Sequence, residues 1–165
     1  LNGMNLAVDR GAPLAESVRS LAAQHPDWAD EIRLWHDGWQ HMFAPVIDAN
    51  VRLLRHLRAQ GVPVFALSNF GQDTFALACK THPFLTEFDQ SYISGHLGFL
   101  KPEAEIYEIL ERKSGIAPEH LFFIDDRLDN IKAAIARGWI GHHFRHTDEL
   151  KHEMEKHGLS VPEEK

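Results

Sequence analysis

Two adjacent aspartates, Asp125 and Asp126, follow an apolar run in the segment FFIDDRLDNIKAA. Neighbouring carboxylates repel one another unless a cation neutralises them, and hard divalent cations prefer carboxylate and water oxygens. The pair therefore predicts a divalent cation at this position. The alternative is a helix N-terminus, where the helix dipole stabilises negative charge without a metal.

Polar residues also follow two other apolar stretches, and we expect both sets of polar residues to lie at strand ends. Ser68 and Asn69 end the segment VPVFALSN, and Lys101 precedes Pro102. Each has an ordinary explanation, because Ser and Asn are typical of turns and helix caps, and Pro is typical of a first helical turn. Their occurrence together with the acidic pair favours a shared chemical role.

The helices and strands that the sequence predicts around these residues indicate an α/β fold. Helical periodicity without a strand signal covers residues 1–45, and residues 46–165 alternate between helix and strand. The predicted helices and strands of the second part are helix 46–60, strand 62–69, helix 72–80, strand 90–94, a helix opened by Pro102, strand 120–126, helix 128–137 and strand 139–144. This alternation predicts a doubly wound, mostly parallel sheet, whose ligands lie beyond the carboxyl ends of the strands.

The helical first part contains a tryptophan stripe and one ambiguous carboxylate. Trp28, Ile32, Trp35 and Trp39 have the spacing of one helix face, which packs against the protein or lines a pocket over the active site. Packing is the favoured interpretation. Asp9 follows a short apolar run and is a candidate nucleophile, but a polar residue of the helical region is the preferred interpretation.

The motifs as a set resemble those of the haloacid dehalogenase (HAD) superfamily of aspartate-nucleophile hydrolases, in its helical-cap subfamily. FALSN is similar to the second motif of the family, GFLKPEAEIY to the third and FFIDDRLDNIKAA to the acidic fourth. The resemblance covers residues 46–145, and residues 1–45 lie where the family has its cap. It implies a Rossmann-like core at 46–165.

The resemblance implies a phosphatase that acts on a small phosphorylated metabolite. Ser68 and the amides around Asn69 would hold the phosphate, Lys101 would neutralise its charge, and Asp125 and Asp126 would bind Mg²⁺. Asp129 is a candidate to support this metal site, with a solvated helix residue as the alternative. The acidic pair makes a metal-independent 2-haloacid dehalogenase the weaker choice.

The first motif of the family, a strand that ends in Asp-x-Asp, is not found before residue 46. Without its first aspartate no aspartyl-phosphate can form, so we expect the 165 residues alone to be inactive. That strand is central in the family, and we therefore expect it upstream of Leu1 or on another chain. A catalytically dead phosphate-binding or regulatory protein is the alternative of a different class.

Composition limits the partners of the chain. The 17 basic and 24 acidic side chains give a net charge of −7, which disfavours nucleic acid and anionic membranes. One cysteine, Cys79, cannot form an internal disulfide, and no signal-like or membrane-length apolar run occurs, so we predict a cytoplasmic location. A zinc site among the 12 histidines is not expected, and the sequence predicts no oligomeric state.

Overall fold

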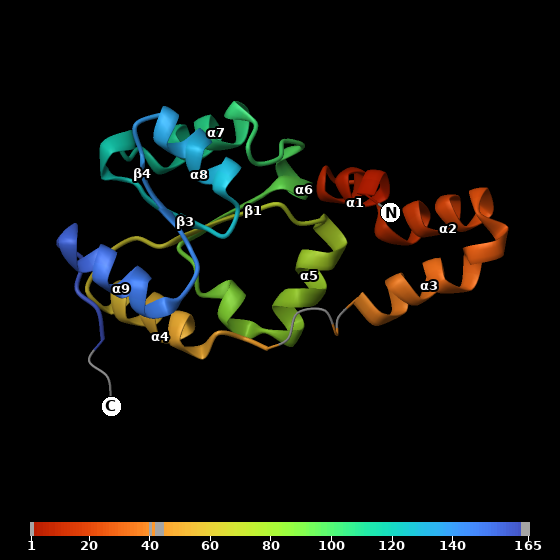
Figure 1. The fold of residues 1–165 in the computed structure, drawn as a ribbon, viewed down its shortest axis with the longest axis horizontal. Coiled ribbons are helices and arrows are strands. Elements are labelled where there is room, and N and C mark those ends of the chain that lie inside the picture. The colour runs from red at the N-terminus through yellow and green to blue at the C-terminus, as the bar shows by residue number, and fades with distance from the viewer. Residues whose placement is uncertain (1, 40, 42–44, 163–165) are drawn as a thin grey trace. The chain divides into compact units, whose positions relative to one another are not determined.

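The protein is described by a computed structural model that places residues 2–39, 41 and 45–162. Its contacts divide the chain into two compact units. The first unit consists of Leu1–Val46 and Phe65–Leu100, and the second consists of Ile47–Val64 and Lys101–Lys165. Both strand pairs are parallel and helices separate the strands along the chain (Figure 1), which confirms the predicted α/β class.

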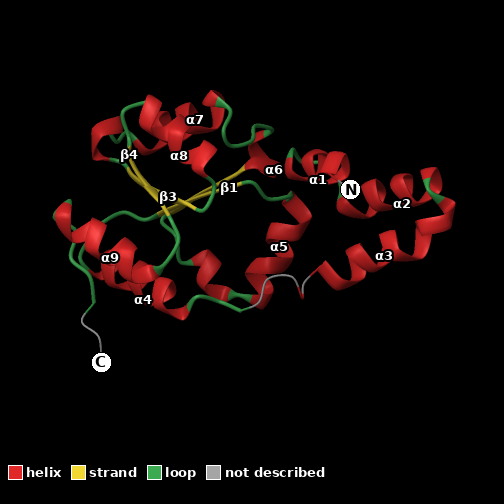
Figure 2. Cartoon of the chain, in the orientation of Figure 1, coloured by secondary structure: helices red, strands yellow, loops and turns green. Residues whose placement is uncertain are grey.

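Helices make up the first part of the first unit. They are α1 (Asn2–Asp9), α2 (Leu14–Gln24), a short 3₁₀ helix (Pro26–Trp28) and α3 (Ala29–Gly38). Figure 2 shows no strand among the described residues that precede β1. These helices bury one apolar cluster, formed by Met4, Val8, Leu14, Val18, Ala22 and Ile32. The helical character predicted for this region is therefore present.

The prediction that Trp28 shares one helix face with Ile32, Trp35 and Trp39 is wrong. Trp28 ends the 3₁₀ helix that Pro26 begins, and 64% of the residue is exposed. Proline fixes the backbone and starts a separate turn, so Trp28 does not share the face of α3. Ile32 and Trp39 are buried, and Trp35 packs against the apolar cluster.

A parallel strand pair forms the second part of the first unit. It consists of β1 (Phe65–Ser68) and β2 (Gln90–Ile93), followed in sequence by α5 (Gln72–Thr81) and α6 (Ser94–Leu97), respectively. Ser68, the last residue of β1, is in register with Ile93, the last residue of β2. The parallel register brings the carboxyl ends of both strands to the same edge, so the polar residues that follow them meet there.

Ser94 joins α1 to this edge. Its side chain is fully buried, its hydroxyl donates to the Asp9 carbonyl oxygen at 2.6 Å, and it accepts from the Phe70 amide at 2.8 Å. The Gly95 amide also donates to the Phe70 carbonyl oxygen at 3.0 Å. One side chain thus fixes the end of α1 and the turn that follows β1.

Replacing Ser94 with alanine should lower the free energy of unfolding by about 1–2 kcal/mol, because the half-buried Phe70 amide loses its acceptor. Urea unfolding checks this value. Ser91→Ala is the matched control, since Ser91 is exposed on β2. Equal stability of Ser94→Ala and Ser91→Ala would contradict the role of the Ser94 hydroxyl.

The second unit contains the other parallel strand pair. Its elements are α4 (Asp48–Ala59), α7 (Ala104–Ser114), a 3₁₀ helix (Pro118–His120), β3 (Phe122–Asp125), α8 (Leu128–Ala136), β4 (Ile140–His143) and α9 (Thr147–Lys156). Leu53 and Leu57 of α4 pack with Leu150 and Met154 of α9. Within the described residues, no helix has the length and hydropathy needed to cross a bilayer.

The helix after Lys101 begins later than the sequence predicts. Pro102 lies in a turn after a cis Lys101–Pro102 peptide, Glu103 is the N-cap, and α7 starts at Ala104. Glu103 has an extended conformation (φ −62°, ψ 141°), so the helical backbone starts only after it. The prediction that Pro102 opens the helix is therefore wrong by two residues. The helix α9 was not predicted from the sequence.

Glu111 of α7 makes a partly buried polar contact with the segment that leads into β4. It accepts from Arg137 Nε at 2.9 Å, Arg137 Nη2 at 2.7 Å and Trp139 Nε1 at 2.7 Å. The hydrogen bond from Arg137 lowers the pKa of Glu111 below its ordinary value of 4.5. A lowered folded-state pKa adds stability above pH 4.5, and this stability is lost as the pH falls through the folded-state pKa.

Replacing Glu111 with glutamine should therefore lower the free energy of unfolding at pH 7 by about 1 kcal/mol. The difference between variant and wild type should shrink as the pH falls below 4.5, because wild-type Glu111 then takes up a proton. Urea unfolding at several pH values measures both effects. Glu108→Gln is the control, since Glu108 is half-exposed and makes one contact with Arg137 at 3.2 Å. A difference that does not change with pH would contradict the charge interaction.

Candidate active site

Lys101 and Asp125 form a buried ion pair in the second unit. Lys101 Nζ lies 2.6 Å from Asp125 Oδ2, and their side chains are 10% and 5% exposed. The Asp125 carboxylate also accepts from the Arg127 amide at 2.8 Å and from Asn130 Nδ2 at 2.9 Å. The structure therefore brings together two of the predicted site residues, and it orients the Asp125 carboxylate with three donors.

Asp126 differs from its neighbour. It is exposed, and its backbone carbonyl oxygen lies 2.9 Å from His143 Nε2. Strand residues alternate in direction, so adjacent aspartates at the end of β3 have different surroundings. One carboxylate of the pair is thus held by protein groups, and the other remains accessible to ligands from solvent.

The Asp125 partners include a residue that the sequence did not single out. Asn130 is 2% exposed and its amide donates to Asp125, whereas Asp129 is exposed in the first turn of α8. The surface position of Asp129 agrees with the solvated alternative. Asn130 has the supporting contact with the acidic pair instead.

An aromatic wall adjoins the ion pair. Lys101 Nζ lies 5.5 Å from the ring centre of Phe123, which packs edge-to-face against Tyr107 and Trp139. Burial, with a smaller contribution from the Asp125 charge, raises the pKa of Tyr107. Tyr107 therefore keeps its proton and donates to the Asn130 carbonyl oxygen at 3.0 Å. This contact holds the backbone that carries the Asn130 amide.

The donor set fits a hard divalent cation in chemical type, because carboxylate oxygens are its preferred protein ligands. The number of protein ligands is too small for a complete site. Among the described residues, no group of three or more His, Cys, Asp or Glu side chains could hold a metal ion. Magnesium commonly completes its shell with water and substrate phosphate. Asp125 and Asp126 are therefore suited to contribute part of such a site.

Ser68 and Asn69 belong to the first unit. Ser68 ends β1, and both residues are half-buried. Asn69 begins the turn that leads to α5, and Ser94 fixes this turn through the Phe70 amide. The turn therefore has a defined backbone at the carboxyl end of β1.

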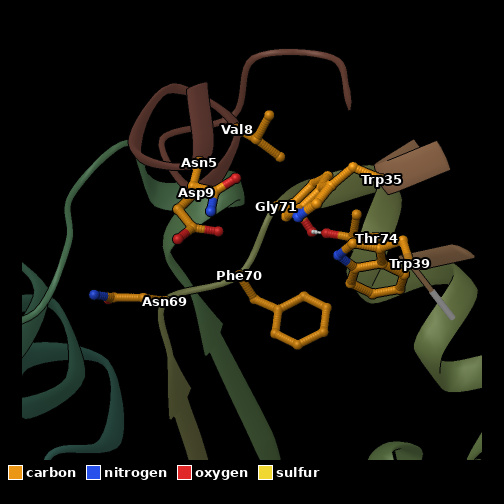
Figure 3. Close-up of a pocket in the computed structure, with 9 residues that line it drawn as sticks. All are labelled: Asn5, Val8, Asp9, Trp35, Trp39, Asn69, Phe70, Gly71 and Thr74. Carbon is orange, nitrogen blue, oxygen red and sulfur yellow. Dashed lines mark hydrogen bonds between the residues drawn. The ribbon is translucent and has the colours of Figure 1, made fainter. Parts of the chain in front are cut away.

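A cavity of about 210 Å³ lies in the first unit beside this turn. Among the residues that line it are Asn5 and Asp9 of α1, Trp35, Trp39, Asn69 and Phe70 (Figure 3). Trp39 packs edge-to-face on Phe70 at 5.6 Å between ring centres. Trp35 and Trp39 thus line a cavity of the first unit.

Asp9 is the titratable residue among the cavity residues. Burial raises the pKa of its carboxyl, and a hydrogen bond with the Gly71 backbone opposes this effect in part. Because α1 is helical up to Asp9, this residue does not follow a strand as the nucleophile of the family would. Asp9 is a polar residue of the helical region, as preferred from the sequence, and it faces a cavity.

Comparison with known proteins assigns the family. Residues 6–138, more than half of the chain, match the haloacid dehalogenase-like hydrolases. The chain belongs to this family. The prediction from the three sequence motifs is therefore confirmed.

This HAD-like hydrolase has relatives with different activities. It is 35% identical over 103 residues to the sesquiterpene phosphatase astK of Aspergillus oryzae, a match that covers 62% of this chain and 52% of astK. It is 27% identical over 120 residues to an (S)-2-haloacid dehalogenase of Pseudomonas fluorescens, covering 69% and 51% of the two chains. The chain thus spans about half the length of these two relatives.

Solved structures of HAD enzymes share the fold of this HAD-like hydrolase. A HAD family enzyme of Bacteroides thetaiotaomicron matches with a TM-score of 0.76 and 25% identity, over 93% of this chain and 78% of that one. The same enzyme in complex with magnesium and inorganic phosphate matches with a TM-score of 0.71 and 25% identity, over 86% and 74% of the two chains. These matches confirm the predicted Rossmann-like fold.

Sequence reasoning missed Asn130, Asn5 and Ser94 in this HAD-like hydrolase. No sequence spacing identifies Asn130 as a partner of Asp125, because Asp129 has an equally suitable position in the first turn of α8. Asn5 lies in a region where the sequence shows only helical periodicity, which does not indicate a cavity. Ser94 ends the predicted strand 90–94, so its position at a strand end was an available signal.

Proposed function

We propose that this HAD-like hydrolase is a Mg²⁺-dependent phosphatase that hydrolyses a small phosphorylated metabolite. The observation that carries the proposal is the Lys101–Asp125 ion pair next to the accessible carboxylate of Asp126. The similarity to a phosphatase and to a HAD enzyme that binds magnesium and inorganic phosphate supports the same activity. Residues 1–45 serve as a helical cap and 46–165 as the core in this proposal.

Each predicted residue has a role that suits its chemistry. Ser68 and the amides of the Asn69 turn bind phosphate oxygens, and the Lys101 ammonium offsets the negative charge that they carry. Asp125 and Asp126 hold Mg²⁺, with Asn130 fixing the orientation of Asp125. When bound, Mg²⁺ neutralises further phosphate charge.

The attacking carboxylate belongs, in this proposal, to a further strand that precedes Leu1. In the described residues each sheet has two strands, and a two-stranded pair is marginal on its own. An additional parallel strand would stabilise the sheet and supply the carboxylate that forms an aspartyl-phosphate. Residues 1–165 alone are then inactive.

Phosphate release by the complete natural protein tests the proposed function. Small phosphate monoesters should be hydrolysed with Mg²⁺ and not after its removal by EDTA, and the isolated 165 residues should show no turnover. Halide release from 2-haloacids without metal would instead support the dehalogenase alternative. Phosphate binding with neither reaction would support the regulatory alternative, and both results would contradict the phosphatase.

A further inference from the structure

The cavity in the first unit has two chemically different sides. In Figure 3 the indole rings of Trp35 and Trp39 lie on one side, and Asn5, Asp9 and Asn69 lie on the other. The aromatic side offers mainly apolar ring area, and the Thr74 hydroxyl beside it already donates to the Gly71 carbonyl oxygen. The polar side adjoins the turn after Ser68. A ligand that fits has an apolar body and one polar end.

The size of the cavity limits the apolar body. Its volume of about 210 Å³ exceeds the about 150 Å³ that holds benzene in an engineered cavity, and it is smaller than the about 300–1,000 Å³ of pockets for drug-sized ligands. The cavity therefore suits a compact group, such as one ring or a short branched chain.

Polar groups at the cavity are incompletely paired. Asn5 Oδ1 is buried and has no hydrogen-bond partner among the described residues. Burial also raises the pKa of the Asp9 carboxyl, which lies on the same side of the cavity. An unpaired buried acceptor favours a ligand with a hydrogen-bond donor at its polar end.

We infer that this cavity is the subsite for the organic group of the phosphate ester, and that it selects a compact apolar group over a polyhydroxylated sugar. The inference rests on the proposed function, and it assigns the substrate class. The phosphate end lies toward Asn69 and the apolar body against Trp35 and Trp39. Sugar hydroxyls placed against the indoles would lose water without gaining partners.

Calorimetric titration of the complete protein in EDTA tests the selectivity without turnover. The probes are benzyl phosphate and glucose 6-phosphate. Wild type should bind benzyl phosphate about tenfold more tightly, as expected for one good aromatic contact. Trp35→Ala should remove most of this preference, whereas Trp28→Ala should keep it, because Trp28 is exposed and does not line the cavity.

A second measurement on wild type avoids any effect of the substitutions on folding. In saturation-transfer NMR, the ring protons of bound benzyl phosphate should receive strong saturation, and the ring protons of glucose 6-phosphate should receive little. Equal affinity for both esters, tighter binding of the sugar ester, or binding of neither would overturn the inference.

Phosphate release separates this inference from the proposed function. Preferred binding of benzyl phosphate without its hydrolysis in Mg²⁺ would contradict the phosphatase and leave the selectivity of the cavity supported. Hydrolysis of glucose 6-phosphate without preference for benzyl phosphate would support the phosphatase and overturn the selectivity.

Discussion

Asp125→Asn should lower the free energy of unfolding by about 3–5 kcal/mol, because it leaves the buried Lys101 ammonium without its counter-charge. The same substitution should decrease phosphatase activity of the complete protein by about 10²–10³-fold, a loss typical of removing one electrostatic group from an active site. Urea unfolding measures the first effect, and the initial rate of phosphate release in Mg²⁺ measures the second.

Two further variants separate stability from catalysis. Asp129→Asn is the matched control, since Asp129 is exposed on α8, and its stability should stay within about 0.5 kcal/mol of wild type. Lys101→Met combined with Asp125→Asn removes both charges, so it should recover part of the lost stability and none of the activity. Full activity of Asp125→Asn would contradict the catalytic role, and unchanged stability would contradict the ion pair.

Gly71→Ala should destabilise the protein by about 3 kcal/mol, because an added methyl group has no space. A Cβ atom at this position would lie 2.5 Å from Val8 Cγ1 and 2.8 Å from Thr74 Oγ1. The backbone of Gly71 (φ −65°, ψ 151°) suits any residue, so the effect comes from the contact with α1 and α5 alone. Thermal or urea unfolding measures it.

The same substitution should weaken ligand binding in the cavity, since Gly71 and Val8 line it. Gly38→Ala is the control: nothing lies within 4 Å of a Cβ there, and alanine in α3 should be neutral or stabilising by about 0.5–1 kcal/mol. Val8→Ala should offset part of the Gly71→Ala penalty, because it removes the nearest atom. Strictly additive effects of Val8→Ala and Gly71→Ala would contradict the direct clash.

The strands β1 and β3 and the polar residues at their ends could be predicted because local sequence determines them. Lys101, also predicted at a strand end, instead lies in a turn that comes after α6. Apolar runs that end in polar residues identified β1 and β3. In a parallel sheet, ligands bind beyond the carboxyl ends of the strands, so these polar residues were the first candidates for a site. A shared site for Lys101 and Asp125 was predicted from the type of these residues and from the motif resemblance, but their direct ion pair was not. Its geometry, with the ammonium 2.6 Å from the carboxylate, agrees with a shared role.

Other features depend on tertiary contacts that periodicity does not encode. Trp28 has the spacing of the α3 face, yet Pro26 starts a separate turn and exposes it. Asn130 was missed because only the packing of α8 selects it over Asp129. The position of Asp9 at a cavity depends on the contact of α1 with Ser94, which the sequence pattern does not show.

The affinity for inorganic phosphate, measured by calorimetry with and without Mg²⁺, tests the proposal most directly. It shows whether the turn after Ser68, proposed to bind phosphate, and the acidic pair serve one catalytic centre. If Mg²⁺ and phosphate bind at one centre, each changes the affinity of the protein for the other by the same factor. Mg²⁺ should tighten phosphate binding at least about tenfold in the complete protein. Asp126→Asn, which changes an exposed side chain, should abolish this gain without unfolding the protein. An identical phosphate affinity with and without Mg²⁺ in wild type would contradict the account.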